Sequence, residues 1–211
     1  MWVDLGKLTA AVLLTALAFL VYAPGATVTR TGLLDNPALT VRPATAAGER
    51  VCSSVAIAPH VALTASHCID GGVDAIDGLP ITGGTRYGDL ARVDVPGLGC
   101  PCAPLAQDAP VQGEVGRAIG FPGGGEKRDR ATTIDAVGTT GDVLGTTLWG
   151  MENVFVWSKP VIRPGDSGGG LFVKRGERWV LVGIHSFLYG WGGFWTVAAS
   201  SATIPPEMAK L

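Results

Sequence analysis

The sequence has little charge, no excess of either sign and no metal-ligand pattern. Charged residues make up 16% of the 211 residues, and the formal net charge is −2. This balance excludes the basic footprint of a nucleic-acid-binding protein, so we expect no nucleic-acid partner. Apolar residues make up 47%, which excludes a disordered chain, because disorder combines low hydrophobicity with high charge. The three histidines and four cysteines lack the four-ligand spacing of a zinc site, and we expect no metal and no cofactor.

Glycine and proline are abundant instead, with 31 Gly and 14 Pro. So many helix breakers leave little room for long helices and suit an all-β domain with tight turns. Most of the apolar runs after residue 50 are short and rich in β-branched and aromatic residues, as strands are. The runs that we interpret as strands are 51–58, 61–65, 90–95, 115–121, 132–137, 143–148, 153–157, 170–173, 179–184 and 194–198. Short strands at this spacing indicate a sandwich or barrels, and three prolines between residues 97 and 112 mark a candidate boundary between two β halves.

One long uncharged apolar stretch stands near the N-terminus, at 8–22. A signal peptide has an apolar region of about 7–15 residues, whereas a spanning helix needs about 20. We therefore predict residues 1–23 as a signal peptide or a retained membrane anchor. Residues 24–47, rich in Ala, Thr and Pro, are predicted as a linker or pro-segment. Both interpretations of the first segment predict a secreted, periplasmic or otherwise extracytoplasmic domain, with membrane contact only through such an anchor.

Three short segments carry candidate chemistry: TASHC at 64–68, DLA at 89–91 and GDSGG at 165–169. Together, and in this order, they resemble the trypsin/chymotrypsin-like serine protease superfamily, including its small bacterial and viral members. The resemblance covers roughly residues 51–203. It implies a protease domain at 48–211.

The same resemblance implies the architecture of that domain. Members of the superfamily consist of two antiparallel six-stranded β-barrels, with the active site in the cleft between them. In this chain the two barrels are expected at about 48–104 and 105–202. The first would contribute the His segment and the second the Ser segment.

The resemblance also implies a catalytic triad of Ser167, His67 and Asp89. A serine hydroxyl is a weak nucleophile at neutral pH and needs an adjacent base. Ser167 would attack the scissile carbonyl, His67 would move the proton, and Asp89 would hold the histidine tautomer. The N–H groups of Gly165 and Ser167 would form the oxyanion hole. We therefore expect an extracytoplasmic serine endopeptidase that cleaves protein or peptide substrates through an acyl-enzyme intermediate.

The choice of carboxylate rests on a local pattern. Asp89 begins the run Asp-Leu-Ala-Arg-Val-Asp-Val, which fits the family's strand pattern Asp-x-Ala-x-apolar-x-apolar. Asp94 is the alternative and fits less well, because Pro96 follows within two residues. The short separation between His67 and Asp89 implies trimmed loops, as in the compact viral members.

The run VLVGIHSF resembles the family strand that lines the primary specificity pocket. By this resemblance Ser186 supports the triad carboxylate, while His185 and Phe187 share the face of the strand that lines the pocket. Val161 and Ile162 stand where the family places the pocket base and its neighbour, and the absence of Asp there disfavours Arg and Lys substrates. His185 resembles the histidine of glutamyl-endopeptidase-like members, so we leave a Glu or Gln preference and a medium apolar preference open.

The four cysteines fall into two close pairs. Cys52 and Cys68 flank the His segment and match the family's disulfide at this place, which an extracytoplasmic compartment allows. Cys100 and Cys102 form Cys-Pro-Cys. The sequence leaves three alternatives open for them: a bond to each other, two reduced thiols, or binding of a partner.

Two further interpretations belong to other functional classes. A catalytically silent binding module on the same fold would not require the complete triad, which argues against it. An α/β-hydrolase would need a helix after Gly-x-Ser-x-Gly, and the three consecutive glycines that follow Ser167 are poor helix formers. No Ile-Val-Gly-Gly activation motif precedes Val51, so the partner of Asp166 is unknown from the sequence.

Overall fold

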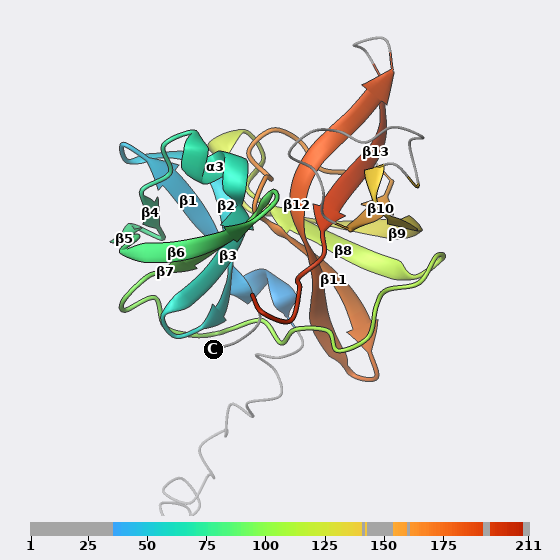
Figure 1. Cartoon of the computed structure of the whole chain (residues 1–211), viewed down its shortest axis with the longest axis horizontal. Helices are drawn as coiled ribbons and strands as arrows, with labels where there is room; N and C mark the ends of the chain where they lie inside the picture. Colours follow the sequence, from blue (N-terminus) through green and yellow to red (C-terminus); the bar gives the residue numbers. More distant parts are fainter. Residues whose placement is uncertain (1–35, 141, 143–153, 160, 192–194, 209–211) are drawn as a thin grey trace, which may run out of the picture. The chain divides into compact units, whose positions relative to one another are not determined.

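Antiparallel strands account for nearly all of the regular structure (Figure 1). The computed structural model describes residues 36–140, 142, 154–159, 161–191 and 195–208. All of these lie in one unit of the chain, Leu33–Leu211. The candidate signal or anchor segment 1–23 and the strand expected at 143–148 lie outside the described residues. Within the described part, no helix is both long and apolar enough to span a membrane.

The first half is an antiparallel sheet of seven strands in the order β5-β4-β1-β2-β3-β7-β6. Its elements along the chain are η1 (Pro37–Thr40), β1 (Val41–Ala46), β2 (Glu49–Ala58), β3 (Val61–Ala65), α3 (Ser66–Asp70), β4 (Ala75–Ile76), β5 (Leu79–Pro80), β6 (Gly83–Tyr87) and β7 (Leu90–Asp94). Edge strand β5 has only two residues, and one of them, Pro80, has no N–H to donate. In the described residues no strand pairing joins β5 to the opposite edge strand, β6.

The second half is a closed barrel of six strands in the order β10-β13-β12-β11-β8-β9. Its elements are β8 (Val115–Gly120), η2 (Pro122–Gly124), β9 (Arg128–Gly138), β10 (Phe155–Ser158), β11 (Gly170–Arg175), β12 (Arg178–Trp191) and β13 (Trp195–Ala202). The expected all-β class with two halves is therefore confirmed. The first half differs from a closed six-stranded barrel, because it is a curled seven-stranded sheet with two short or glycine-rich edges.

The first sheet begins earlier than the sequence predicts. Strand β1 lies inside the 24–47 segment that was expected to be a linker, and it pairs with both β2 and β4. Val41 and Ala44 of β1 are fully buried. The sequence did not predict this strand because it contains Pro43, and a proline inside a run normally argues against a strand. The Pro43 carbonyl nevertheless accepts a hydrogen bond from Asp77.

A continuous apolar core joins the two halves. Val55, Leu63 and Leu90 from the first sheet belong to the same buried cluster as Phe172 and Ile184 from the barrel. Burying an aliphatic or aromatic side chain of this size contributes about 1.5–3 kcal/mol. The halves are therefore held together by packing as well as by the chain that connects them.

The connection between β7 and β8 runs along both halves, and Figure 1 shows it in green beneath them. The N–H of Ala103 donates to Ala56 of β2 at 2.7 Å, and the N–H of Leu181 in β12 donates to Pro104 at 2.8 Å. Leu105 forms an isolated bridge with Leu181. The crossing from one half to the other thus occurs near Pro104.

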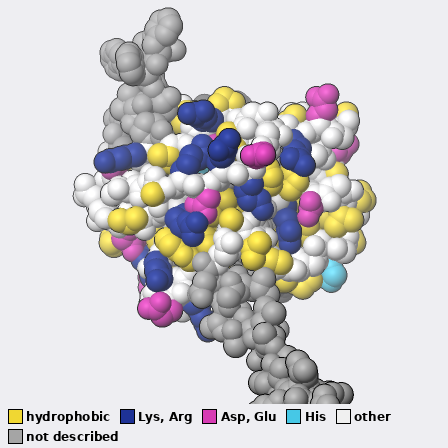
Figure 2. All heavy atoms as spheres, turned by 180° about the vertical axis from the view of Figure 1, so that it is seen from behind, with side chains coloured by type: hydrophobic (Ala, Val, Ile, Leu, Met, Phe, Trp, Pro, Cys, Tyr) yellow, Lys and Arg dark blue, Asp and Glu magenta, His cyan; other side chains and the backbone are white. Residues whose placement is uncertain are grey.

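The surface carries charges of both signs. On the face turned away from the view of Figure 1, Lys and Arg side chains are interspersed with Asp, Glu and apolar side chains (Figure 2). The mixture agrees with the net charge of −2 for the chain.

Candidate active site

His67 and Asp89 meet at the edge of the first sheet. His67 is the second residue of the five-residue helix α3, which follows the fully buried strand β3. Asp89 occupies the two-residue turn between β6 and β7, where Gly88 has a positive φ of 53°. The Nδ1 atom of His67 lies 2.9 Å from Oδ1 and 3.0 Å from Oδ2 of Asp89. The backbone N–H of His67 donates to the same carboxylate at 3.0 Å.

Asp89 is buried, and a side chain from the other half also contacts its carboxylate. The Ser186 hydroxyl of β12 donates to its Oδ2 atom. Burial disfavours the charged form, but the hydrogen bonds from His67 and Ser186 outweigh it, so the pKa of Asp89 lies below its usual value. The hydrogen bond with Asp89 likewise raises the pKa of His67 above 6.5, against the opposing effect of burial. The pair therefore holds a negative charge beside Nδ1 of the imidazole.

Asp94, the alternative carboxylate, has a different partner. It accepts a hydrogen bond from Arg92 at 2.8 Å, and its side chain is 45% exposed. The structure brings Asp89, and not Asp94, to His67.

The Ser167 backbone is fixed against the first sheet by Ser53 of β2. The N–H of Ser53 donates to the Ser167 carbonyl at 2.7 Å, and its hydroxyl donates to the Gly165 carbonyl at 2.8 Å. The Ser167 carbonyl oxygen also lies 3.7 Å from Sγ of Cys68, the residue after His67. The loop that carries Ser167 is thus in contact with the helix that carries His67. Sequence reasoning did not single out Ser53, because a serine inside a strand gives no local signal of such a role.

Two glycines of the Ser167 loop leave no space for a side chain. Gly165 has a φ of 92°, and a Cβ there would lie 2.6 Å from the Phe121 carbonyl oxygen. Gly168 has a φ of 83°, and its Cβ would lie 2.0 Å from the Ser53 carbonyl oxygen. Both the backbone conformation and the close approach require glycine. The GDSGG run is therefore a tightly packed turn.

Several polar groups at the site face no internal partner. Among the described residues, the N–H groups of Gly165 and Ser167 have no hydrogen-bond acceptor. In the same part of the chain, neither the Ser167 hydroxyl nor the Nε2 atom of His67 makes a hydrogen bond. The half-buried Ser167 and the histidine, whose side chain is 44% exposed, remain open to a bound molecule.

Asp166 has an internal cationic partner that the sequence did not reveal. Its side chain is fully buried, and Oδ2 accepts hydrogen bonds from Nη2 of Arg130 at 2.6 Å and from the N–H of Arg163 at 2.7 Å. Burial raises the pKa of Asp166, although the hydrogen bond from Arg130 opposes this. Arg130 lies in β9, far from Asp166 in the sequence. The two meet because β9 pairs with β8 and Asp166 lies against Gly120 of β8.

Both cysteine pairs form disulfides. Cys52 and Cys68 are joined, with their Cα atoms 6.3 Å apart. The bond ties β2 to the helix that carries His67. Cys100 and Cys102 are joined as well, with their Cα atoms 4.6 Å apart, which resolves the alternatives that the sequence left open.

The residues expected to set specificity lie in two places: His185 and Phe187 are on strand β12, and Val161 and Ile162 are in a separate cluster. His185 is buried inside the barrel, where Nδ1 lies 2.9 Å from the Ser201 hydroxyl and Nε2 has no partner among the described residues. Burial, with a smaller effect of the Arg130 charge, lowers the pKa of His185 to about 3. Phe187 packs edge-to-face on Phe155 at 5.3 Å between ring centroids.

Val161 and Ile162 belong to a small separate cluster. Ile162 is buried against Ala118 of β8, and Val161 and Leu188 pack around them. Both residues thus lie beside β12, the strand that carries His185 and Phe187.

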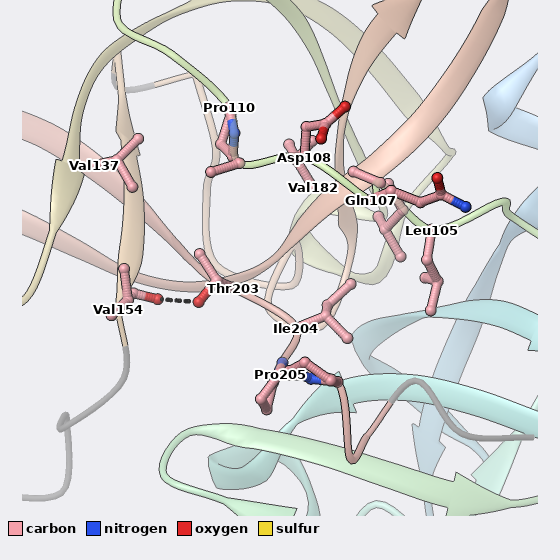
Figure 3. A pocket seen from close by; sticks show the side chains of 14 residues that line it. Leu105, Gln107, Asp108, Pro110, Val137, Val154, Val182, Thr203, Ile204 and Pro205 are labelled. Carbon is pink, nitrogen blue, oxygen red and sulfur yellow. Dashed lines mark hydrogen bonds between the residues drawn. The ribbon is translucent and has the colours of Figure 1, made fainter.

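The structure has a cavity of about 770 Å³ (Figure 3). It is formed by the connection between the two halves and by the segment after β13, where the Thr203 hydroxyl donates to the Val154 carbonyl at 2.8 Å. None of the residues expected in the active site lines it. The candidate site is therefore the surface around His67 and Ser167.

Three solved structures that resemble this chain are described as proteases. The Rv3671c protease from M. tuberculosis, in its active form, is 19% identical, with a TM-score of 0.60 over 82% of this chain and 81% of that chain. The HtrA-type protease AlgW, crystallised with a tripeptide, is 25% identical, with a TM-score of 0.62 over 84% of this chain and 60% of that one. The serine endoprotease from Yersinia pestis is 19% identical, with a TM-score of 0.60 over 81% of this chain and 61% of that one.

This likeness establishes the two-barrel fold of trypsin-like serine proteases. The chain spans about 60% of the length of AlgW. No protein-family model and no curated protein sequence matches the chain.

Proposed function

We propose that the chain is a serine endopeptidase that hydrolyses peptide bonds through an acyl-enzyme intermediate. The observation that carries the proposal is the contact of His67 Nδ1 with the buried Asp89 carboxylate, at 2.9 Å. A carboxylate in this place fixes the tautomer with the proton on Nδ1 and leaves Nε2 free to act as a base. The half-exposed Ser167 lies on a loop in contact with the residue after His67.

The catalytic cycle follows from these groups. Ser167 Oγ attacks the scissile carbonyl while His67 Nε2 takes the hydroxyl proton, and the same proton is then given to the leaving amine. Water attacks the acyl-enzyme in a second step, with His67 again as the base. The negative Asp89, whose pKa is lowered by hydrogen bonds, stabilises the imidazolium in both steps.

The backbone N–H groups of Gly165 and Ser167 are proposed to bind the oxyanion. Both lack an acceptor among the described residues, so they can donate to the tetrahedral intermediate without breaking an internal bond. Removing one such donor in a comparable enzyme reduces turnover by about 10²–10³. Gly165 has a positive φ and admits no side chain, so a substitution there would disturb the peptide that carries this N–H.

The loop is held in place from within the chain. Arg130 neutralises Asp166 behind Ser167 at 2.6 Å, which supports a site that needs no newly formed N-terminal amine. Processing of the N-terminal segment is then separate from assembly of the oxyanion hole.

We propose a preference for Gln, and secondarily Glu, at the residue before the cleaved bond. Among the described residues, the Nε2 atom of His185 makes no hydrogen bond. The ring is buried, so a substrate side chain must enter beside it, and a polar one would then satisfy Nε2. Because the pKa of His185 is about 3, its ring is neutral at physiological pH. A neutral donor suits an amide better than a carboxylate.

An extracytoplasmic location is proposed from the cysteines. Both cysteine pairs of the described chain are oxidised, and disulfides persist mainly outside reducing compartments. The peptide bound to AlgW supports a peptide substrate for this chain as well.

The test is hydrolysis of peptides blocked at both ends, matched except for Gln, Glu, Leu, Val or Arg before the scissile bond. We expect cleavage by the wild type, fastest after Gln, and none by Ser167→Ala. Cleavage restricted to Leu or Val would overturn the specificity but leave the hydrolase intact. Binding of peptides without turnover by a folded wild type would instead support the silent binding module.

A further inference from the structure

The two disulfides differ in their access to solvent. Cys52 and Cys68 are buried in the core of the first sheet, with exposed fractions of 7% and 2%. Cys100 is exposed, and Cys102 is half-buried with its Sγ atom 3.8 Å from the Gly99 carbonyl oxygen. Exposed disulfides are the ones that exchange with external thiols. Only one of the two bonds is therefore placed for such exchange.

The loop that contains Cys100 and Cys102 is held independently of the bond between them. Before the pair, the N–H of Gly99 donates to the Pro59 carbonyl at 2.8 Å. After it, the N–H of Ala103 donates to the Ala56 carbonyl at 2.7 Å. Both acceptors belong to the first sheet or the turn that follows β2. These contacts keep the two Cα atoms close, at 4.6 Å in the disulfide, when the bond opens.

The bond itself constrains little of the unfolded chain. The cysteines are separated by two positions, whereas Cys52 and Cys68 are separated by sixteen. In the chain-entropy description, stabilisation by a disulfide grows with the loop that it closes. Opening the Cys100–Cys102 bond thus removes the smaller constraint on the unfolded chain. Because Gly99 and Ala103 stay hydrogen-bonded to the first half, the bond is expected to re-form rapidly.

We propose that Cys100 and Cys102 form a reversible thiol–disulfide exchange site for low-molecular-weight thiols, distinct from peptide hydrolysis. A thiolate attacks Sγ of the exposed Cys100, a mixed disulfide forms, and the bond to Cys102 breaks with Cys102 leaving as a thiolate. A second thiolate attacks the sulfur of the first thiol, which releases that pair as a disulfide. The cysteine pair then gains two electrons, and the two thiols lose them.

The reverse reaction closes the cycle. Before a second thiol arrives, the Cys102 thiolate can attack Sγ of Cys100 and expel the first thiol. Cys102 is therefore the resolving cysteine, and Cys100 is the cysteine that carries the adduct.

The test uses glutathione as the thiol and the full native protein. The protein is incubated in buffers of defined reduced-to-oxidised glutathione ratio, and free thiols are trapped with an alkylating reagent and located by peptide mass spectrometry. We expect the Cys100–Cys102 bond to open about 100-fold faster than the Cys52–Cys68 bond. Opening of both bonds together, or of neither without denaturant, would overturn the proposal.

Single variants test the order of attack. In oxidised glutathione, Cys102→Ser is expected to accumulate one glutathione on Cys100, and Cys100→Ser to react at least about tenfold more slowly on Cys102. Equal rates would contradict the assignment of Cys100 as the point of entry. The double variant Cys100→Ser/Cys102→Ser is expected to shift the unfolding midpoint by no more than about 4 °C, and a larger loss would show that the bond is structural.

Discussion

Arg130 and Asp166 form an ion pair behind the loop that carries Ser167. Their closest atoms are 2.6 Å apart, the carboxylate is fully buried, and the guanidinium side chain is 22% exposed. The Oδ1 atom of Asp166 has no partner among the described residues. The conformation of the loop therefore depends on a cation supplied by β9.

Substituting Arg130→Met is expected to destabilise the protein strongly. It leaves a buried carboxylate without its cation, and breaking a buried pair in this way costs about 3–5 kcal/mol. We also expect kcat to fall, because the N–H groups of Gly165 and Ser167 lie on either side of Asp166. Urea unfolding and peptide hydrolysis measure the two effects.

The matched control is Arg128→Ala, in the same strand. Arg128 is exposed, so its loss is expected to change stability by no more than about 0.5 kcal/mol. If Arg130→Met and Arg128→Ala lost the same stability, the Arg130–Asp166 pair would have no special role. If Arg130→Met/Asp166→Asn regained part of the lost stability, the unpaired Asp166 charge would be the cause of the loss.

Gly168→Ala is expected to abolish hydrolysis. The added Cβ would lie 2.0 Å from the Ser53 carbonyl oxygen, at a φ of 83°, so the loop must move. Gly176→Ala is the matched control, because Gly176 also has a positive φ, of 59°, but nothing lies within 4 Å of its added Cβ. We expect Gly176→Ala to cost about 1–2 kcal/mol and to keep full kcat. Equal activity of the two variants would contradict the close packing of the Ser167 loop.

The pH dependence of kcat/KM reports on His67. Catalysis needs the neutral imidazole, and the hydrogen bond with Asp89 raises the pKa of His67 above 6.5. Activity is therefore expected to rise with pH through an acid limb above 6.5. The same shift stabilises the fold fully below pH 6.5, and this stabilisation disappears as pH rises through the folded-state pKa.

Asp89→Asn tests this assignment. We expect kcat to fall by about 10⁴-fold and the acid limb to move to lower pH, because burial then acts without the carboxylate. Asp94→Asn is the control and should leave both unchanged, since Asp94 contacts Arg92 instead. An acid limb that did not move in Asp89→Asn would show that another group titrates.

Loss of the buried disulfide is expected to be costly. Cys52→Ala/Cys68→Ala opens a bond with a sequence separation of 16, which should lower the free energy of unfolding by about 3 kcal/mol. Because Cys68 follows His67 directly, kcat should fall as well. Denaturant unfolding at equal protein concentration measures the first effect, and an unchanged midpoint would contradict it.

Site residues and strands could be predicted from the sequence where neighbouring residues in the chain form a recognisable pattern. His67 and Ser167 each stand in short runs whose neighbours are also required: Cys68 forms a disulfide, and Gly168 fits where no side chain can. Asp89 was chosen over Asp94 from the residues that follow it, and the structure brings Asp89 to His67. The short apolar run 61–65 coincides with β3.

The missed features depend on distant parts of the chain. Arg130 meets Asp166 through the pairing of β8 with β9 and the packing of Asp166 against β8, and no local pattern marks it. Strand β1 was not predicted because it contains Pro43. Strand β6 was not predicted because it is exposed and contains two glycines, so it lacks the usual strand composition. The open edge of the first sheet was not predicted either. It depends on whether the short edge strands β5 and β6 pair with each other, and no local pattern reports this.

The most direct test of the account is labelling with a fluorophosphonate probe, followed by peptide mapping, for the wild type, Ser167→Ala and His67→Ala. The account predicts one adduct, on Ser167 of the wild type, and no adduct in either variant. Ser53→Ala, probed in parallel, should retain the adduct on Ser167 if the protein folds, because its hydroxyl supports the loop without reacting. No labelling of folded wild type, or an adduct on another residue, would contradict an activated Ser167.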